Sequence, residues 1–415
     1  MEKNKNVPKL RFPEFTGEWE EKKLGEVAIF KSGYAFKSEF MLSKKCKYQI
    51  LKMSNVYQNE LNLERNPSYL ESIDEKQKDF LLRKGDSILT LTGTVGKKDF
   101  GYSVIINEDN KFLLNQRLVL LREVASISAN GFINYVLSTE KFLFFFFAEA
   151  KGGTGNQTNV STEDVKNISL GFPHLPEQTK IASFLTSVDE KLTQLKKKKT
   201  LLEQYKKGIM QKLFSQELRF KDNNNQDFPD WQEKTLGEIG EFIGGGTPST
   251  KNNEYWSGNI PWISSSDLTE GSIFKINSTR FISEEAISQS ATKLVPVNSV
   301  LIVSRVGVGK VAVSNSPLCT SQDFTNLVPL NQNSIFLAYL IKLKTDSLLG
   351  FNQGTSIKGF VKSDLESLKL LIPSLPEQQK IATFLSAIDE KISHSSAQIE
   401  KMEAWKKGLL QQMFC

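Results

Sequence analysis

Two stretches of this 415-residue chain, LPEQTKIASFLTSVDEK at 175–191 and LPEQQKIATFLSAIDEK at 375–391, are near-copies of each other. Twelve of their 17 positions are identical at a constant offset of 200 residues. The same offset aligns YKKGIMQKLF at 205–214 with WKKGLLQQMF at 405–414. Self-similarity of this length indicates an internal duplication. We therefore expect two units of similar fold.

Both copies have the pattern of a long helix. Pro176 and Pro376 fit the first helical turn, and the glutamate after each lies near the positive end of the helix dipole. Apolar residues then recur at alternating spacings of four and three, which is typical of a coiled-coil seam. The first copy supplies Ile181, Leu185, Val188, Leu192, Leu195, Leu202, Ile209 and Leu213, and the second Ile381, Leu385, Ile388, Ile392, Ile399, Met402, Leu409 and Met413.

We expect these two helices to pair antiparallel as a rigid spacer of about 55 Å, with a globular domain at each end and a pseudo-two-fold axis. The seam is weaker at Lys199, which takes the place of Ile399, and at Ser395, which takes the place of Leu195. The alternative is that each helix packs only on its own domain. A heptad repeat of this length is uncommon on a surface helix, so we favour the antiparallel helix pair.

A second set of matches lies upstream, at an offset near 212. WEEKKLGEV at 19–27 pairs with WQEKTLGEI at 231–239. The predicted organisation is a domain at 1–174, a helix at 175–216, a second domain at 217–374 and a helix at 375–415. Leu10-Arg11-Phe12 and Leu218-Arg219-Phe220 lead into the two domains. If the halves fold alike, the N-terminal segment rests beside the end of the second helix, in a near-circular arrangement.

The domain interiors differ between the copies, and their class is α+β. Short β-branched and aliphatic runs predict strands at 88–91, 102–106, 118–121, 299–303 and 310–313. Helices are predicted at 132–150 and 335–344. The most apolar run, 142–148, is too short to cross a bilayer and predicts the buried side of a helix.

Loops rich in Gly, Ser, Thr, Asn and Gln, with Lys or Arg beside them, lie between these elements in both halves. Such residues suit DNA, because small residues let the backbone approach, Lys and hydroxyls bind phosphates, and Arg, Asn and Gln pair with base edges. Plain turn chemistry is the alternative for any one loop. The candidate DNA-binding residues are Lys31, Ser32, Tyr34, Lys37, Thr92, Thr94, Lys97, Lys98, Gln116, Arg117, Lys151, Asn156 and Gln157 in the first half, and Thr247, Ser249, Thr250, Lys251, Ser304, Arg305, Lys310, Gln322, Asn352, Gln353, Thr355, Ser356 and Lys358 in the second.

Bulk composition fits this picture. The net charge is +6, and the segment 177–214 holds nine lysines against four acids, whereas 377–414 holds five of each. Excess positive charge favours a polyanion, although such a run of lysines is more often a solvated helix face. Three scattered cysteines and a basic, polar N-terminus predict a reducing cytoplasm rather than secretion.

Catalytic patterns are missing. SRVGVGKV at 304–311 has Ser304 where a phosphate-binding loop needs its first glycine, and Val311 follows the lysine. Asn66-Pro67-Ser68-Tyr69 only approximates the Asn/Asp-Pro-Pro-aromatic motif of amino-methylating enzymes. The sequence contains no apparent metal cluster, and Pro229-Asp230 has no nuclease-type Glu-x-Lys partner. A duplicated chain without a repeated catalytic constellation favours a DNA reader that is not itself an enzyme.

Taken together, these motifs resemble the specificity subunit of bacterial type I restriction-modification enzymes. The resemblance covers nearly the whole chain and rests on PKLRFPEF at 8–15, the two Trp-led motifs, GGTPST at 245–250, GNIPWISSSDL at 258–268, and both LPEQxKIAxFL helices with their KKGxxQxxF endings.

The resemblance implies that each domain reads one half of a split, asymmetric duplex target, while the helices set the gap and dock two methylating subunits. The partners would then be double-stranded DNA, those methylating subunits and translocating, cleaving subunits, without a membrane. The cofactors S-adenosylmethionine, ATP and magnesium would belong to the partners, and this cytoplasmic chain would hold none. Two other hypotheses remain: a stand-alone endonuclease or methyltransferase, and a coiled-coil scaffold that binds protein rather than DNA.

Overall fold

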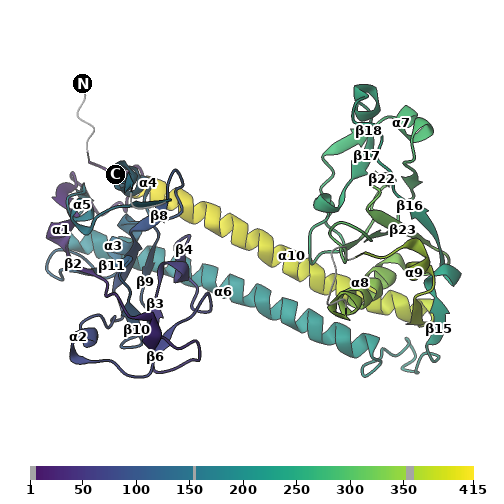
Figure 1. The fold of residues 1–415 in the computed structure, drawn as a ribbon, viewed down its shortest axis with the longest axis horizontal. Helices are drawn as coiled ribbons and strands as arrows, with labels where there is room; N and C mark the ends of the chain where they lie inside the picture. The colour runs from purple at the N-terminus through teal and green to yellow at the C-terminus, as the bar shows by residue number, and fades with distance from the viewer. Residues whose placement is uncertain (1–5, 153–155, 352–358) are drawn as a thin grey trace. The chain divides into compact units, whose positions relative to one another are not determined.

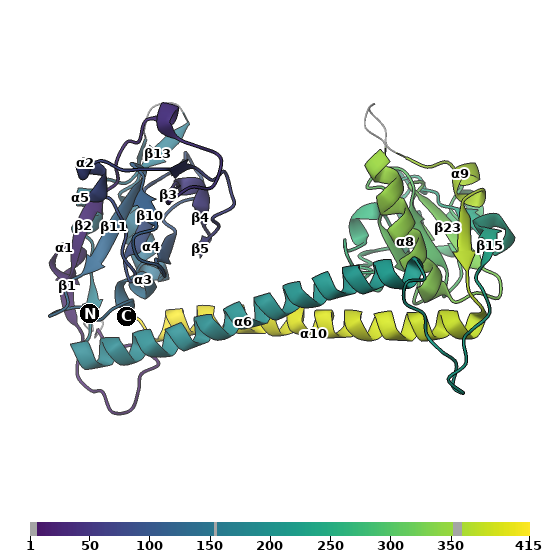
Figure 2. The same ribbon diagram turned by 90° about the horizontal axis from the view of Figure 1, so that it is seen from below.

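The computed structural model describes residues 6–152, 156–351 and 359–415. The chain forms two compact units: unit 1 comprises residues 1–197 and 397–415, and unit 2 comprises residues 198–396. Two long helices, α6 (Leu175–Phe214) and α10 (Leu375–Gln412), are unbroken and pass from one unit into the other (Figures 1 and 2). Each unit therefore holds one domain, the beginning of one long helix and the end of the other.

Unit 1 is built on a four-stranded antiparallel sheet in the order β2-β11-β7-β9. Smaller sheets follow the orders β10-β3-β6, with β10 parallel to β3, β12-β13-β8, β1-β14 and β4-β5. The strands are β1 (Glu20–Lys23), β2 (Ala28–Ser32), β3 (Tyr48–Leu51), β4 (Val56–Tyr57), β5 (Glu60–Leu61), β6 (Tyr69–Leu70), β7 (Ser87–Thr90), β8 (Thr92–Thr94), β9 (Ser103–Ile105), β10 (Phe112–Leu114), β11 (Leu118–Glu123), β12 (Lys151–Gly152), β13 (Gln157–Asn159) and β14 (Ser169–Phe172). Its shorter helices are α1 (Leu24–Val27), η1 (Ser38–Phe40), η2 (Met53–Asn55), α2 (Glu75–Lys78), α3 (Phe132–Val136), α4 (Glu140–Ala148) and α5 (Thr162–Lys166).

Unit 2 repeats the main sheets of this plan. Its four-stranded sheet follows the order β16-β23-β20-β21 and is again antiparallel throughout. A second sheet, β18-β17-β22-β19, again contains one parallel pair, β17 with β22, and β15 pairs with β24. The duplication therefore extends into the domain interiors, where the two sequences differ.

The elements of unit 2 have the following bounds. The strands are β15 (Gln232–Thr235), β16 (Gly240–Gly244), β17 (Ile260–Ile263), β18 (Arg280–Ile282), β19 (Leu294–Val295), β20 (Val300–Val303), β21 (Val311–Val313), β22 (Leu318–Thr320), β23 (Phe324–Pro329) and β24 (Lys369–Ile372). The shorter helices are η3 (Leu236–Glu238), η4 (Asn253–Trp256), η5 (Ser265–Asp267), α7 (Glu284–Gln289), α8 (Ser334–Phe351) and α9 (Lys362–Glu366). No helix in the described part of the chain is long and apolar enough to cross a membrane.

All five predicted strands are confirmed, as β7, β9, β11, β20 and β21. The single helix predicted at 132–150 is wrong, because the chain breaks between α3 and α4. Thr139 causes the break: its hydroxyl donates to the Val136 carbonyl at 2.7 Å and accepts from the Phe142 amide at 3.2 Å, capping α4. The helix predicted at 335–344 is longer in the structure, as α8.

The aromatic run in α4 is only partly buried. Phe142 and Phe146 lie in the core of unit 1, one turn apart on the same helix face. Phe144 points to the other side and is 70% exposed. The prediction that 142–148 forms the buried side of a helix is therefore correct for one face alone.

The long helices pair antiparallel within each unit, as predicted. In unit 1, Ile181, Leu185 and Val188 of α6 share a core with Leu409 of α10 and with Met413, directly after this helix. In unit 2, the core holds Met210 and Leu213 of α6 together with Ile381, Leu385 and Ile388 of α10. The end of each helix thus completes the core of the other repeat's domain, which excludes the alternative that each helix packs only on its own domain.

The weak seam positions lie close in sequence to the unit boundaries at 197/198 and 396/397. Leu195 is buried in unit 1, and Ser395 is buried in unit 2, where its hydroxyl donates to the Lys391 carbonyl at 2.9 Å. Lys199 turns its ammonium to Glu203 at 3.9 Å, and Ile399 is half-buried. Leu192, Leu202, Ile209 and Ile392 are also half-buried. The other buried seam residues lie toward the start or the end of their helices.

The N-terminal segment lies beside the end of α10, as the repeat predicts. The Leu10 amide donates to the Gln412 carbonyl at 2.8 Å, and in unit 2 the Leu218 amide donates to the Lys212 carbonyl at 3.1 Å. In unit 2 this hydrogen bond joins residues that are close in sequence. In unit 1 the equivalent hydrogen bond joins the N-terminal segment to the end of the C-terminal helix. These equivalent contacts are what the predicted near-circular arrangement requires.

Candidate nucleic-acid interface

The four predicted loops of unit 1 come together at one end of its main sheet. The Gly33 amide donates to the Leu118 carbonyl at 3.1 Å and Tyr34 bridges Asn115, which joins the 31–37 loop to the 115–117 turn. The Leu91 amide donates to the Arg117 carbonyl at 3.3 Å, which brings in the 92–98 loop. Pairing of β13 with β8 sets Gln157 opposite Thr94 and so adds the fourth loop.

Unit 2 gathers its loops through equivalent contacts. The Gly246 amide donates to the Thr320 carbonyl at 2.8 Å, and the Thr247 hydroxyl bonds the Gln322 side chain. The Ser304 amide donates to the Asp323 carbonyl at 2.8 Å. The Phe360 amide donates to the Ser304 carbonyl at 2.8 Å, so the chain that follows the fourth predicted loop lies at the same end. Residues 352–358, which contain the candidates Asn352, Gln353, Thr355, Ser356 and Lys358, lie outside the described residues.

Glycine makes this close packing possible at one equivalent position in each unit. A Cβ on Gly33 would lie 2.0 Å from the Asn115 carbonyl oxygen, and one on Gly245 would lie 1.9 Å from the Ser321 carbonyl oxygen. Because no larger residue fits there, the first loop can rest directly on the turn that precedes β11 or β23. The loop ends are thereby held by backbone contacts.

Within each cluster, some predicted residues face solvent and some do not. Ser32, Lys37, Lys97, Lys98, Gln116, Arg117, Lys151, Asn156, Thr247, Ser249, Thr250, Lys251, Arg305 and Gln322 are exposed. Ser32 bonds the Thr162 hydroxyl at 2.9 Å, and Lys151 pairs with Asp164 at 3.3 Å. The Tyr34 ring meets Phe36 edge-on and packs at a tilt against Phe80, with ring centroids 5.0 Å apart in both pairs. The exposed side chains of both clusters are accessible to a ligand that covers the loop end.

Four predicted DNA-binding residues have side chains that are buried or bonded within the domain. Ser304 is 2% exposed, and its hydroxyl lies 2.9 Å from that of Thr325. The Lys310 ammonium donates to the Ser265 and Leu268 carbonyls at 2.9 and 3.2 Å. Thr92 is buried in β8, and the Lys31 ammonium donates to the Asp79 carbonyl at 2.5 Å. In the sequence these four residues cannot be told apart from the exposed candidates, because residue type alone does not say which way a side chain points.

The 92–98 loop is closed by a carboxylate that the sequence reading missed. Asp99 accepts from the Thr94 amide at 2.8 Å and from the Thr94 hydroxyl at 2.7 Å. These hydrogen bonds lower the pKa of Asp99, since they favour its charged form. Gly96, with φ +74°, forms the tip between them. Lys97 and Lys98 are consequently presented on a closed turn.

The two clusters differ in charge. The segments 31–37, 92–98, 115–117 and 151–157 contain six Lys or Arg residues and no carboxylate. The corresponding segments 244–250, 304–310, 321–323 and 352–358 contain three cations and one carboxylate, Asp323. Phosphate contacts draw on such cations, so the polyanion would be held more strongly by unit 1 than by unit 2.

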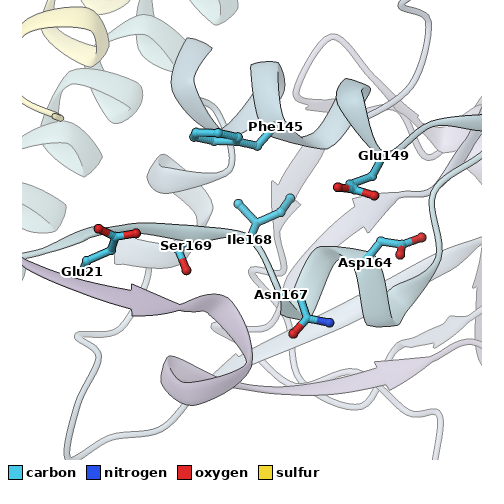
Figure 3. Close-up of a pocket in the computed structure, with 7 residues that line it drawn as sticks. All are labelled: Glu21, Phe145, Glu149, Asp164, Asn167, Ile168 and Ser169. Atoms are coloured by element: carbon cyan, nitrogen blue, oxygen red, sulfur yellow. The ribbon is translucent and has the colours of Figure 1, made fainter.

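A shallow hollow elsewhere in unit 1 does not fit a polyanion. Its lining includes Glu21, Glu149 and Asp164, together with Phe145 and Asn167 (Figure 3). Three carboxylates at one hollow repel phosphates. Among the described residues no group of acidic, histidine or cysteine side chains is arranged to hold a metal ion. The loop ends are therefore the better candidate for nucleic-acid contact.

Each unit also contains a buried anchor at the start of its long helix. Glu177 accepts from Arg11 at 2.7 Å through both oxygens and from the Trp19 indole at 3.3 Å. In unit 2, Glu377 accepts from Arg219 and from the Trp231 indole at 3.1 Å. The glutamates are thus more than partners of the helix dipole: they bind the lead-in segment to the helix. Their presence in both copies was the signal that could have revealed them.

The outer face of the helix pair carries a second duplicated feature. Trp405 is 49% exposed and meets Phe184 edge-on, with ring centroids 6.0 Å apart. Tyr205, the equivalent residue of α6, is 53% exposed. One turn further along each helix, Gly208 and Gly408 leave open space, with no atom within 4 Å of an added Cβ. Nothing in the described chain occupies these positions.

Comparison with known proteins places this architecture in a family. Residues 16–204 and 229–404 match the profile of the type I restriction modification DNA specificity domain. The chain is 38% identical over 195 residues to the type I restriction enzyme MjaIX specificity subunit of Methanocaldococcus jannaschii, an alignment that covers 46% of this chain and 45% of that one. It is 31% identical over 263 residues to the EcoR124I/EcoR124II specificity subunit of Escherichia coli, covering 60% of this chain and 63% of that one. The alignments thus span about half to two thirds of these relatives.

Solved structures share the fold at low sequence identity. The S subunit of a type I restriction-modification system from M. genitalium superposes with a TM-score of 0.63 at 17% identity, over 99% of both chains. A second structure, from work on complex assembly and conformational transition of the type I R-M system, gives a TM-score of 0.55 at 16% identity. Since the two profile matches cover most of the chain, one in each repeat, the chain belongs to the type I restriction modification DNA specificity family.

Proposed function

We propose that this chain is the DNA-specificity subunit of a type I restriction-modification complex, in which each unit reads one half of a split duplex target. The observation that carries the proposal is the repeated gathering of polar loops at the end of an equivalent sheet: four loops in unit 1, and in unit 2 the three described loops with the chain that follows the fourth. The loop side chains differ between the units, as in Gln116-Arg117 against Gln322-Asp323. The two half-targets are therefore non-identical.

The paired helices fix the gap between the half-targets and dock the methylating subunits. Continuity of α6 and α10 from one unit into the other supports the first role. The second role is supported by the duplicated outer face with Trp405 and Gly408 in one unit and Tyr205 and Gly208 in the other. A surface that occurs twice suits two copies of one partner.

The chain acts as a reader and leaves chemistry to its partners. S-adenosylmethionine belongs to the methylating subunits, and ATP and magnesium to the translocating and cleaving subunits. The complex acts in the bacterial cytoplasm, where its DNA is found.

The decisive experiment uses the chain assembled with its methylating subunits. Duplexes with randomised bases are selected for binding, and methylated adenines are mapped in a genome that expresses the complex. We expect one split, asymmetric target, two methylating subunits per chain by native mass spectrometry, and binding that weakens steeply with salt. Binding without sequence preference would contradict the proposal, as would methylation or cleavage by this chain alone with S-adenosylmethionine and magnesium.

A further inference from the structure

Each loop cluster contains one arginine whose charge is left for a ligand. The chain has eight arginines. Four make ion pairs (Arg11, Arg122, Arg219 and Arg280) and Arg65 lies over the Tyr57 ring. Among the described residues, the remaining three, Arg83, Arg117 and Arg305, have no side-chain partner and are exposed. Arg117 belongs to the cluster of unit 1 and Arg305 to that of unit 2.

Both loop clusters contain an equivalent backbone hydrogen bond. Arg117 supplies its acceptor in unit 1, whereas Arg305 directly follows the donor residue in unit 2. In unit 1 the Leu91 amide donates to the Arg117 carbonyl, and in unit 2 the Ser304 amide donates to the Asp323 carbonyl. Arg117 is therefore equivalent to Asp323. By the same alignment Arg305, which follows Ser304, is equivalent to Thr92, which follows Leu91. The units thus present the same chemical group from neighbouring but different positions.

Both positions have a fixed backbone. Arg117 ends a turn closed by the Leu118 amide and the Asn115 carbonyl at 3.0 Å, directly before the inner strand β11. The Arg305 amide donates to the Asp323 carbonyl at 3.3 Å, just after β20. A planar guanidinium on a fixed backbone can direct two parallel N–H donors, which a mobile lysine cannot.

We propose that Arg117 and Arg305 each recognise a guanine in the half-target of their unit, by paired hydrogen bonds to its O6 and N7 edge. The guanidinium matches this edge of guanine in the major groove. Exposed lysines of the same clusters, such as Lys97 and Lys98, provide point charges for phosphates. Because the two arginines stand at non-equivalent positions, the guanines fall at different places within the two half-targets. The inference rests on the proposed function and deepens it.

The test uses the complex of this chain with its methylating subunits and a library of duplexes with randomised bases. For Arg117→Gln we expect preference at one position of one half-target to relax by about tenfold to a hundredfold. Arg305→Gln should do the same at one position of the other half-target. Arg117→Lys keeps the charge and loses the paired donors, so it should also relax the same position, and it carries the test if the Gln variant does not assemble.

Arg83→Gln is the matched control. It removes the same charge from an exposed, unpartnered arginine, yet Arg83 precedes β7 while the loop cluster follows it. This variant should select the wild-type target. Equal weakening on all sequences with Arg117→Gln, or a wild-type preference with Arg117→Lys, would show a phosphate contact and overturn the inference. A wild-type complex without sequence preference would instead overturn the proposed function.

Discussion

Lys206 of α6 lies between an aspartate and a tyrosine in the core of unit 2. Its ammonium is 2.6 and 2.8 Å from the Asp389 carboxylate and 4.9 Å from the centre of the Tyr339 ring. The Tyr339 hydroxyl donates to the same carboxylate at 2.5 Å. Burial raises the pKa of Tyr339, so the phenol stays a donor. Lys406, Asp189 and Tyr135 form the equivalent cluster in unit 1.

The Lys206 and Lys406 clusters differ in burial, so replacing the two lysines should lower the free energy of unfolding by different amounts. The Lys206 and Asp389 side chains are 11% and 12% exposed, whereas those of Lys406 and Asp189 are 26% and 32% exposed. Lys206→Met removes the cation that pairs with the buried Asp389 carboxylate and leaves only the Tyr339 hydroxyl as its partner there, so it should lower the free energy of unfolding by about 3 kcal/mol. Lys406→Met should cost about 1 kcal/mol, because water screens that pair.

Urea denaturation of both variants checks this prediction, with the exposed neighbour Lys207 as the control. Lys207→Met should change stability by less than about 0.5 kcal/mol. An equal loss from Lys206→Met and Lys406→Met would show that burial does not govern the strength of these clusters.

Cys319 of β22 makes stability depend on pH in the alkaline range. Burial raises the pKa of this thiol from 9.0 to about 11. Between these values the unfolded chain loses the proton and the folded chain keeps it, so the free energy of unfolding falls as the pH rises. Cys319→Ala should make the decline shallower by up to about 1.4 kcal/mol per pH unit. Denaturation curves at pH 8 to 11 measure this slope, and a constant difference between variant and wild type would contradict the prediction.

At the scale of elements, Gly208 and Gly408 are unfavourable residue types within two continuous helices. Both stand in regular helix, and an added Cβ meets no atom within 4 Å. Glycine in a helix interior costs about 1 kcal/mol relative to alanine. The isolated chain gains no stability from either glycine, which is consistent with the proposed docking of a partner on this face.

Gly208→Ala and Gly408→Ala should each stabilise the isolated chain by about 0.5–1 kcal/mol. Thermal unfolding of the chain without partners is the measurement. Assembly with the methylating subunits provides the companion assay, since a methyl group on that face would obstruct a closely packed partner. Destabilisation by either substitution would mean that the space beside the helix is not open.

The helices could be predicted from the sequence because their signal is local and repeated. Strands such as β7 and β20 could be predicted for the same reason. The break at Thr139 could not, because the apolar pattern continues through it and one side-chain cap decides the outcome. The Arg11–Glu177 anchor joins residues 166 apart, so no local pattern announces it. Inward-facing Lys310 shows the same limit within the candidate interface.

At the scale of the molecule, the long helices are the only described elements that belong to both units. Deleting residues 195–201 and 395–401 removes one heptad from each helix and keeps the seam in phase. Each helix becomes shorter by about 10 Å, so the gap between half-targets should shrink by about three base pairs at 3.4 Å per pair.

Mapping methylated sites for this double deletion tests the role of the helices as a spacer. The half-target sequences themselves should stay the same, because every loop is untouched. Deleting 195–201 alone shifts one helix against the other and should prevent assembly. An unchanged gap in the double deletion would assign the spacing to something other than the helices.

The exchange of helix ends suggests how such a chain could have arisen. The core of unit 1 is completed by Leu409, Met413 and Phe414, and that of unit 2 by their counterparts Ile209, Leu213 and Phe214. Each repeat lends its last turns to the other, as protomers do in a domain-swapped homodimer. A half-length ancestor could have satisfied both cores by self-association, and it would have recognised a palindrome. Gene fusion would then have freed the two halves to diverge, and the proposed asymmetric target would follow from that divergence.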